Sequence, residues 1–477
     1  MSTSPRLLRS APPMGRIRNV HMVGIGGIGM SSIAEVLLAR GHTVTGSDLQ
    51  KSEVTDHLES LGAVVYEGHS AANVLEADVV VYSSAVRADE NPETVEARRL
   101  HIPIIKRSEM LGELMRMKFG IGVAGTHGKT TTTTMVGLVA QEAGFDPTII
   151  VGGKVAVFGS NAVSGLGDVI VIEADEYDRT FLKLTPALAL ITNIEAEHLD
   201  IYEDLDDIKQ AFTQYANSVP FFGAAIVCLD DPNVRDILSD IHRRVLTYGT
   251  SRQAEIRAEN IEQVGASMHF DVFRRNDRLG GAMLHAPGVH NVLNALGAVA
   301  VGLELDVPFE TIVQGLAMYS GVDRRFQIRG EAGGVIVVDD YAHHPTEIIV
   351  TLDAATTGWP SRRIVAVFQP HLYSRTVHLA DDFARAFVNA DVLVLTDIYG
   401  AREAPIEGVD GAMLAKLAEQ NGHRAVHYVE DKTELPAFLL GLVESGDLVI
   451  TMGAGDIWRQ GKAFFEQLVE RNAEVVS

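Results

Sequence analysis

The sequence predicts an α/β protein built from about three domains, and three observations support this. The chain has 477 residues, and domains contain about 150 residues on average. Short apolar stretches typical of buried strands alternate with amphipathic stretches of helical periodicity. Two glycine-rich turns, GIGGIGM and GTHGKTTTT, each follow an apolar stretch and lead into a helical one. A glycine-rich turn in that context is typical of a phosphate-binding site.

The first hundred residues predict a small parallel sheet surrounded by helices. A strand (IRNVHMV) leads through the first glycine-rich turn into a helix (MSSIAEVLLAR), and a second strand (HTVTGSD) follows after Gly41. Further apolar strands are expected at 79–84 and 103–106. We expect this domain to span residues 1–107.

The first glycine-rich turn matches the pattern G-x-G-x-x-G through Gly24, Gly26 and Gly29. Asp48 ends the next strand, where an acid that binds ribose would lie. On this pattern alone the domain binds a dinucleotide, and tight packing of strand against helix without a ligand is the alternative. Gly26, Gly27, Gly29 and Asp48 are therefore candidate ligand-binding residues.

The second domain is expected over residues 108–324. A helix (SEMLGELMRM) leads into the strand FGIGVAG, then into the second glycine-rich turn and another helix. The apolar runs at 168–175 and 187–194 end in polar residues, as buried parallel strands do near a site. The segments VLTYG, AEIRAENIEQ and SMHFDVFRR alternate apolar with polar residues, so we expect antiparallel strands between about 244 and 285.

The second turn predicts an ATP-binding loop. Backbone N–H groups and the helix N-terminus favour an anion, Lys129 adds a positive charge, and the Thr130 hydroxyl can bind Mg²⁺. The spacing departs from G-x-x-x-x-G-K-[ST], because Val123 stands where the first glycine is usual and Gly122 precedes it. A glycine-rich turn without a ligand is the alternative.

Metal ligands for such a loop are expected at neighbouring strand ends. Glu173 closes one strand and His198 follows the next. Magnesium prefers oxygen ligands, so His198 taken alone is more typical of a hydrogen-bonding imidazole. The competing carboxylates are Asp175, Glu176, Glu195 and Glu197, and a cluster of acids is most often a solvated loop.

The third domain is expected over residues 325–477. The charged, glycine-containing segment SGVDRRFQIRGE predicts a hinge between Gly321 and Gly330. Four units of strand and polar loop follow it: VIVVDDYAHHP, RIVAVFQPHLYSR, DVLVLTDIYGARE and DLVITMGAGDI. Helical stretches separate these units, which predicts another α/β domain.

Composition excludes several classes of protein. The 63 Asp and Glu residues outnumber the 40 Lys and Arg residues, giving a formal net charge of -23, so nucleic acid is an unfavourable partner. The one cysteine, Cys228, lies in an apolar run and is expected in a core. No uninterrupted apolar run reaches about 18 residues, and the N-terminal segment reads as a disordered lead-in without a signal peptide. A cytoplasmic protein without a membrane partner is expected.

Two phosphate sites in one chain require a chemistry that uses both. An NAD-dependent oxidation has no need for an ATP loop, so the first site more plausibly holds another diphosphate, such as a nucleotide sugar. Together the motifs GIGGIGMS, GTHGKTTTT, NIEAEHLD, PGVHNVLNALGA, DRRF, DDYAHHPTE and QPHLYSR resemble the Mur ligase family over nearly the whole chain. The resemblance implies an N-terminal Rossmann-like domain for a UDP-sugar, a central P-loop ATPase-like domain and a C-terminal Rossmann-like domain for an amino acid.

The resemblance also implies roles for particular residues. Binding of ATP is implied for Gly125, Thr126, His127, Gly128, Lys129, Thr130, Thr131, His290, Asn291, Asn294 and Arg325. Binding of Mg²⁺ is implied for Thr130, Glu173 and His198. Contacts to the UDP-sugar or the amino acid are expected from Ser84, Arg107, Arg324, Tyr341, His343 and His371. Roles in the reaction are expected for Lys129, His198, His344 and Arg375, with His343 or His344 accepting the proton of the amine.

One departure points to a branch of the family. Relatives that add later amino acids carry a carbamylated lysine about fifteen residues after the histidine, whereas Thr213 stands here and the nearest lysine is Lys209. The resemblance implies that the branch without this lysine joins L-alanine to UDP-N-acetylmuramate. We expect the protein to be a monomer or a weak homodimer. A ligase that recycles UDP-muramyl peptides, an NAD-dependent oxidoreductase and a non-catalytic ATP-dependent switch remain alternatives.

Overall fold

The computed structural model describes residues 14–476 except 156, 159, 199, 200 and 402. The N-terminal lead-in was expected over residues 1–18; residues 1–13 of it lie outside the described residues, and residues 14–16 form a turn before the first strand. The chain forms two compact units. The first comprises Met1–Ala258, Val272–Gly280 and Leu293–Tyr319, and the second comprises Glu259–Asp271, Gly281–Val292 and Ser320–Ser477. Among the described residues, no helix has the length and apolar character needed to cross a bilayer.

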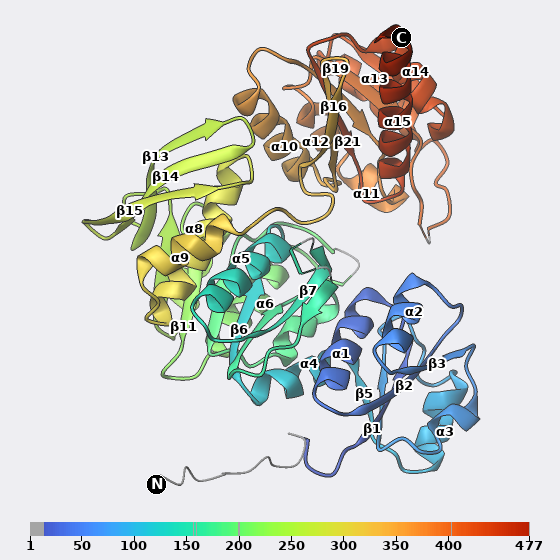
Figure 1. Ribbon diagram of the computed structural model, residues 1–477, viewed down its shortest axis with the longest axis vertical. Helices are drawn as coiled ribbons and strands as arrows, with labels where there is room; N and C mark the ends of the chain where they lie inside the picture. Colours follow the sequence, from blue (N-terminus) through green and yellow to red (C-terminus); the bar gives the residue numbers. More distant parts are fainter. Residues whose placement is uncertain (1–13, 156, 159, 199–200, 402, 477) are drawn as a thin grey trace. The chain divides into compact units, whose positions relative to one another are not determined.

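The N-terminal sheet, drawn in blue in Figure 1, has five strands in the order β3-β2-β1-β4-β5 and is parallel throughout. This confirms the predicted parallel sheet. Its strands are β1 (Asn19–Val23), β2 (Thr43–Asp48), β3 (Val64–Glu67), β4 (Val79–Tyr82) and β5 (Ile104–Lys106). Its helices are α1 (Ile28–Ala39), α2 (Glu53–Ser60) and α3 (Pro92–Arg99), with a 3₁₀ turn η1 (Ala71–Val74). Ser52 caps α2, and Asn91 caps α3 ahead of Pro92.

The central sheet has ten strands in the order β15-β14-β13-β12-β11-β10-β6-β9-β7-β8. The strands are β6 (Phe119–Ala124), β7 (Thr148–Val155), β8 (Ser160–Val163), β9 (Val169–Glu173), β10 (Leu188–Ile191), β11 (Ala224–Cys228), β12 (Val245–Gly249), β13 (Ile256–Val264), β14 (Ser267–Arg274) and β15 (Asp277–Leu284). The accompanying helices are α4 (Arg107–Arg116), α5 (Lys129–Glu142), α6 (Leu205–Asn217), α7 (Pro232–Ile237), α8 (Val289–Glu304) and α9 (Phe309–Ala317), with 3₁₀ turns η2 (Tyr177–Lys183) and η3 (Leu238–Asp240). Cys228 is buried at the end of β11, as predicted.

One predicted orientation in this sheet is wrong. The segment VLTYG was expected to be antiparallel to its neighbours, but β12 pairs parallel with β11 on one side and with the start of β13 on the other. The chain returns through α7 after β11, and a crossover through a helix produces a parallel neighbour. Alternation of apolar and polar residues marks a half-buried strand but does not reveal its direction. The hairpin of β7 and β8 was not foreseen.

The third sheet, in the second unit, has the order β16-β17-β21-β18-β19-β20. Its strands are β16 (Gln327–Ala332), β17 (Val335–Asp340), β18 (Arg363–Phe368), β19 (Val392–Thr396), β20 (Val426–Val429) and β21 (Asp447–Met452). Its helices are α10 (Pro345–Gly358), α11 (Tyr373–His378), α12 (Ala380–Ala386), α13 (Gly411–Gln420), α14 (Leu435–Leu442) and α15 (Ile457–Val476), with η4 (Lys432–Glu434). Helices α10 and α12 lie on one side, and α14 and α15 on the other (Figure 1). Both faces are buried, as near-continuous apolar strands predict.

Part of the segment predicted as a hinge is a β-strand. Residues 327–330 belong to β16, which pairs antiparallel with β17 and carries an irregularity between Ile328 and Gly330. The second unit resumes at Ser320, and Gly321 has a φ of 95° in open space. A strand held by ladder hydrogen bonds cannot absorb a change of backbone angles, so any hinge is confined to the residues before 327.

A buried acid in β17 gives the second unit a distinctive pH dependence. The Asp340 carboxylate accepts hydrogen bonds from Phe326 N and Ala342 N, both at 2.7 Å. Burial raises the pKa of Asp340 from 3.8 to about 6 against the opposing charge of Arg325. Because the unfolded chain releases this proton at lower pH than the folded chain, Asp340 lowers the free energy of unfolding as pH rises between these values.

Asp340→Asn should therefore gain stability relative to the parent as pH rises. The difference in unfolding free energy between variant and parent should increase by about 2 kcal/mol from pH 4 to pH 7, since one pKa unit corresponds to about 1.4 kcal/mol and the unfolded chain has already lost part of this proton at pH 4. Urea unfolding at several pH values measures it. A difference that stays constant with pH would contradict this interpretation of the Asp340 environment.

Candidate active site

The second glycine-rich turn joins β6 to α5 and is held by the end of β10. Gly128 adopts a left-handed conformation with a φ of 78° at the start of α5. His127 N donates to Asn193 Oδ1 at 2.8 Å, and the Thr192 hydroxyl donates to His127 O at 2.6 Å. Thr126 N also donates to the Asn193 carbonyl at 3.1 Å. The turn is thereby fixed before any anion binds, which lowers the entropy cost of binding.

Lys129 is directed back over this turn. Its Nζ donates to the carbonyls of Gly125 at 2.7 Å and Thr126 at 3.0 Å, and to Glu176 Oε1 at 2.8 Å. Burial alone would lower the pKa of Lys129, but the charges of Glu176 and Asp175 raise it above its ordinary value. The side chain is therefore a charged ammonium, suited to neutralising phosphate oxygens.

The end of β9 and the first turn of α5 bring a carboxylate and a hydroxyl together next to the turn. The Thr130 hydroxyl donates to Glu173 Oε2 at 2.9 Å, and Gly152 N donates to the same oxygen at 2.6 Å. Burial raises the pKa of Glu173, although these hydrogen bonds oppose the shift. Thr130 and Glu173, both predicted as metal ligands, thus lie in direct contact.

His198 belongs to a second group near the turn. Glu176, Glu197 and His198 each place one ligand atom within 4.8 Å of the others. His198 Nε2 lies 3.7 Å from Glu176 Oε1. Burial would lower the pKa of His198, but the hydrogen bond with Glu176 and the charge of Glu197 raise it. Two carboxylates that the sequence offered only as competitors are therefore grouped with the predicted histidine.

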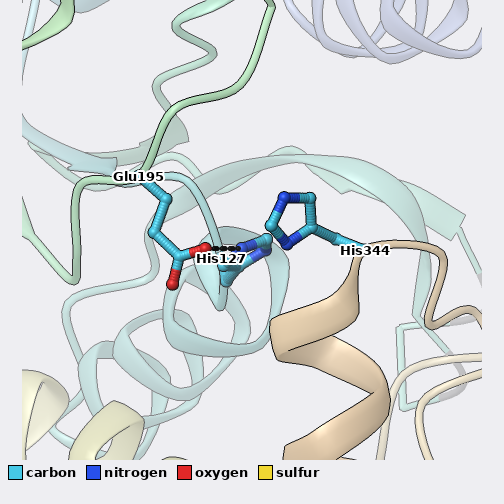
Figure 2. Close-up of side chains that lie close together, drawn as sticks. All are labelled: His127, Glu195 and His344. Atoms are coloured by element: carbon cyan, nitrogen blue, oxygen red, sulfur yellow. Dashed lines mark hydrogen bonds and ion pairs between the residues drawn. The ribbon is translucent and has the colours of Figure 1, made fainter. Parts of the chain in front are cut away.

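His127 has its own carboxylate partner. Its Nε2 lies 3.3 Å from Glu195 Oε2, and Figure 2 shows the imidazole directed at that carboxylate. Asn294, also in the first unit, accepts a hydrogen bond from the Thr132 hydroxyl at 3.1 Å. A Cβ on Gly128 would lie 2.5 Å from Asn294 Oδ1. The side chain of Asn294 is thus packed directly against the turn.

The other residues of the PGVHN segment lie in the second unit. Asn291 Nδ2 donates to Pro287 O at 2.7 Å, which fixes the start of α8. Burial, with a smaller contribution from the charge of Arg325, lowers the pKa of His290 to about 4. His290 is therefore neutral at pH 7 and offers one donor and one acceptor.

At the first glycine-rich turn, the carboxylate of Asp48 accepts hydrogen bonds from the backbone. Its Oδ2 accepts from Gly26 N and its Oδ1 from Leu49 N, both at 2.8 Å. Gly27 is the N-cap of α1. A Cβ on Gly29 would overlap the guanidinium of Arg107, so the glycine lets this arginine lie directly against the turn. Ser84 is the second residue after β4.

The predicted arginine pair of the second unit is firmly anchored. Arg324 Nε lies 3.2 Å from Asp339 Oδ2, and Arg325 Nη1 lies 3.3 Å from Glu347 Oε1. Both guanidinium groups face the Tyr341 ring, at 4.9 and 5.4 Å from its centroid. Both arginines are held by ion pairs and ring contacts, with the Arg324 side chain 16% exposed and that of Arg325 34% exposed, and each is partly neutralised by its carboxylate.

The ends of β17 and β18 bring the remaining predicted residues together. The rings of Tyr341 and His343 lie 5.2 Å apart, and those of His343 and His371 lie 6.1 Å apart. Arg375 Nη1 lies 3.3 Å from His371 Nδ1. Burial, followed by the charges of His343 and Arg375, lowers the pKa of His371 to about 4. His344 is the buried N-cap residue of α10.

Sequence reasoning missed the residues that hold the site in place. Thr192 and Asn193 hold the second glycine-rich turn through hydrogen bonds, and Tyr399 stacks on His371 with ring centroids 5.7 Å apart. All three follow the last apolar residue of a parallel strand. That position could have identified them as candidates, because ligand sites of α/β sheets lie at the carboxyl ends of strands.

Comparison with known proteins agrees with this geometry. Three family models match successive parts of the chain: "Mur ligase family, catalytic domain" over residues 19–119, "Mur ligase middle domain" over 123–302 and "Mur ligase, glutamate ligase domain" over 324–455. The chain is 67% identical over 461 residues to the UDP-N-acetylmuramate–L-alanine ligase of Salinibacter ruber, covering 97% of each protein. It is 53% identical over 457 residues to the ligase of that name from Geobacter sulfurreducens, covering 96% of this chain and 99% of the relative.

Solved structures give the same result. The UDP-N-acetylmuramate–alanine ligase of Thermotoga maritima is similar with a TM-score of 0.79 and 31% identity, over 96% of this chain and 100% of that one. A murein peptide ligase from Psychrobacter arcticus is similar with a TM-score of 0.66 and 25% identity, over 95% and 99% of the two chains. The resemblance predicted from the motifs is confirmed.

Proposed function

The chain belongs to the Mur ligase family, and from that premise we propose that it joins L-alanine to the carboxylate of UDP-N-acetylmuramate in peptidoglycan synthesis. The reaction consumes ATP and yields UDP-N-acetylmuramoyl-L-alanine, ADP and phosphate. The observation that carries the proposal is the 67% identity, over 97% of both proteins, to a ligase of this name. An NAD-dependent oxidation would leave the charged Lys129 without a role.

The chemistry explains why two phosphate sites occur in one chain. A carboxylate does not react with an amine at a useful rate, because oxide is a poor leaving group. Transfer of the γ-phosphoryl group of ATP to the muramate carboxylate forms an acyl phosphate, and attack by the alanine amine then releases phosphate. Bringing a triphosphate to a carboxylate places two anions together, and Lys129 offsets their repulsion.

The acidic groups around the turn fit a magnesium ion. Carboxylate and hydroxyl oxygens are the ligands that Mg²⁺ prefers, and Thr130 and Glu173 supply both in direct contact. We assign Thr130, Glu173 and His198 to the ion, with Glu176 and Glu197 as further oxygen donors grouped with His198. When bound, Mg²⁺ neutralises phosphate charge, which the ammonium of Lys129 cannot do alone.

The second unit supplies the residues proposed to bind alanine. In this proposal Arg375 pairs with the carboxylate of the amino acid, and the neutral His371 orients the guanidinium through Nδ1, which lies 3.3 Å from Arg375 Nη1. His343 or His344 accepts the proton that the amine must lose before it attacks. The amine is mostly protonated at pH 7, so this transfer is part of the reaction.

An omission assay tests the proposed function. Phosphate release should require ATP, UDP-N-acetylmuramate and L-alanine together, and leaving out any one should abolish it. Replacing alanine with a preformed tripeptide distinguishes a ligase that recycles UDP-muramyl peptides, an activity suggested by the similarity to the murein peptide ligase. Faster release with the tripeptide than with alanine would overturn the proposal, as would a change of nicotinamide absorbance in place of phosphate release.

The role of Arg375 predicts a selective defect. Arg375→Ala should raise the KM for alanine roughly 10- to 100-fold, the loss expected when a charged hydrogen bond is removed. The KM for ATP should stay within about two-fold. Arg375→Lys keeps the charge but not the planar fork, so its KM should be intermediate. Initial rates of phosphate release over a range of alanine concentrations measure all three, and an unchanged KM for alanine would remove Arg375 from the site.

A further inference from the structure

The N-terminal sheet contains a buried carboxylate that the proposed reaction does not use. Glu93, in the first turn of α3, has 0% of its surface exposed, as do His21 in β1 and Ser47 in β2. Burying an ionised carboxylate costs hydration free energy, which hydrogen bonds to the carboxylate must offset. A well-packed apolar residue would serve stability at least as well, so the charge calls for another explanation.

Both carboxylate oxygens of Glu93 have hydrogen-bonding partners. Oε2 accepts from the Ser47 hydroxyl at 2.6 Å and lies 3.2 Å from His69 Nδ1. Oε1 accepts from Asn73 Nδ2 at 2.7 Å and lies 3.5 Å from His21 Nε2. Burial would raise the pKa of Glu93, but the hydrogen bonds with His21, Ser47 and Asn73 lower it to about 2. Glu93 is therefore an anion at neutral pH.

The two groups on Oε2 lie at the carboxyl edge of the sheet. The Ser47 carbonyl accepts hydrogen bonds from Gly24 N at 2.8 Å and Ile25 N at 3.1 Å, so Ser47 supports the start of the first glycine-rich turn. His69 follows β3 after Gly68, and β3 is the neighbour of β2. Ligands of open parallel sheets bind in the crevice at this edge.

His69 reaches from the buried network to solvent. Its side chain is 17% exposed, against 0% for that of Glu93. With Nδ1 engaged by Ser47 and Glu93, Nε2 is the ring nitrogen through which His69 can contact a ligand. Leu49 directly follows Asp48, the last residue of β2, and is 74% exposed. Its side chain offers an apolar surface against which a planar base can pack.

We propose that Glu93 is a positioning residue of the nucleotide site, which orients His69 and Ser47 so that His69 Nε2 contacts the uridine diphosphate part of the substrate. The proposal rests on the proposed function, because it takes the first turn to bind a UDP-sugar. It goes beyond that function because it assigns the nucleotide contact to His69. It also assigns the orientation of His69 to Glu93, a buried side chain that does not itself contact the ligand.

Two single variants and their combination test this coupling. Glu93→Gln keeps the shape but removes the charge, and His69→Ala removes the contact itself. Each should weaken the binding of UDP, measured by calorimetry with the whole protein, about 10-fold, the loss expected for one good hydrogen bond. The double variant should bind UDP no more weakly than the worse single variant, because Glu93 acts through His69. The KM for UDP-N-acetylmuramate should rise in parallel, with kcat and the KM for ATP within about two-fold.

A control at the opposite edge of the same sheet separates positioning from stability. Asp78 Oδ2 accepts hydrogen bonds from Arg18 N at 2.7 Å and Asn19 N at 2.8 Å, where β1 begins. Asp78→Asn should lower thermal stability without changing the affinity for UDP. If Glu93→Gln fails to fold, Ser47→Ala removes the hydroxyl on Oε2 and should weaken UDP binding in its place.

The outcomes distinguish the two proposals. If the parent binds UDP and releases phosphate with alanine, but folded Glu93→Gln binds UDP within two-fold of the parent, the positioning role is wrong and the proposed function stands. Additive losses in the double variant would also overturn the coupling. If the parent neither binds UDP nor releases phosphate, the proposed function is wrong, and the positioning role of Glu93, which rests on it, is wrong as well.

Discussion

Lys129→Ala should abolish turnover, with kcat reduced by at least about 10³-fold, while the affinity for UDP-N-acetylmuramate stays within a few-fold. The ammonium is the cation placed directly over the turn, donating to two of its carbonyls and to Glu176. Preorganised charges of this kind contribute most where charge develops in the transition state. Removal also leaves the buried Glu176 carboxylate without its nearest cation. Single-turnover phosphate release and calorimetry with the UDP-sugar measure the two effects separately.

Lys209→Ala is the matched control for loss of a lysine in the same unit. Lys209 on α6 forms a salt bridge at 2.8 Å with the exposed Asp236 on α7, and a bridge at the protein surface contributes at most about 1 kcal/mol. Its kcat should be close to that of the parent. A Lys129→Ala protein that still released phosphate at a comparable rate would show that the triphosphate is neutralised elsewhere.

Gly128→Ala should eliminate ATP binding in a protein that still folds. The residue has a φ of 78°, and its Cβ would lie 2.5 Å from Asn294 Oδ1. An alanine in the left-handed region costs about 1–2 kcal/mol, and relief of the overlap must displace Asn294 or the turn. Because the turn is the proposed phosphate cradle, either movement should raise the Kd for ATP by more than about 100-fold. Equilibrium binding of a non-hydrolysable ATP analogue measures this.

Gly144→Ala provides a control on the same helix. Gly144 follows the C-terminus of α5 with an identical φ of 78°, but nothing lies within 4 Å of its Cβ. It carries the same backbone strain without the overlap, so stability should fall by a similar amount while ATP binding is retained. Equal binding losses in the two variants would mean that general destabilisation, and not the turn, explains the effect.

The sequence predicted the local elements around the site well. The strand, turn and helix at 119–142 and at 19–39 are where the periodicity placed them, because each depends on residues a few positions apart. The direction of β12 and the strand β16 were not foreseen. Both depend on which distant strand provides the hydrogen bonds, and a single strand carries little information about its neighbour.

The sequence by itself determined the two glycine turns, the lysine that follows the second turn and the strands that lead into both turns, since periodicity and backbone conformation are properties of neighbouring residues. Tertiary structure alone decided the partners: Lys129 with Glu176, 47 residues away, Thr130 with Glu173, 43 residues away, and Glu93 with Ser47, 46 residues away. Parallel strands bring such residues to one edge only after crossovers through helices. The charge and orientation of each group therefore depend on the assembled sheet.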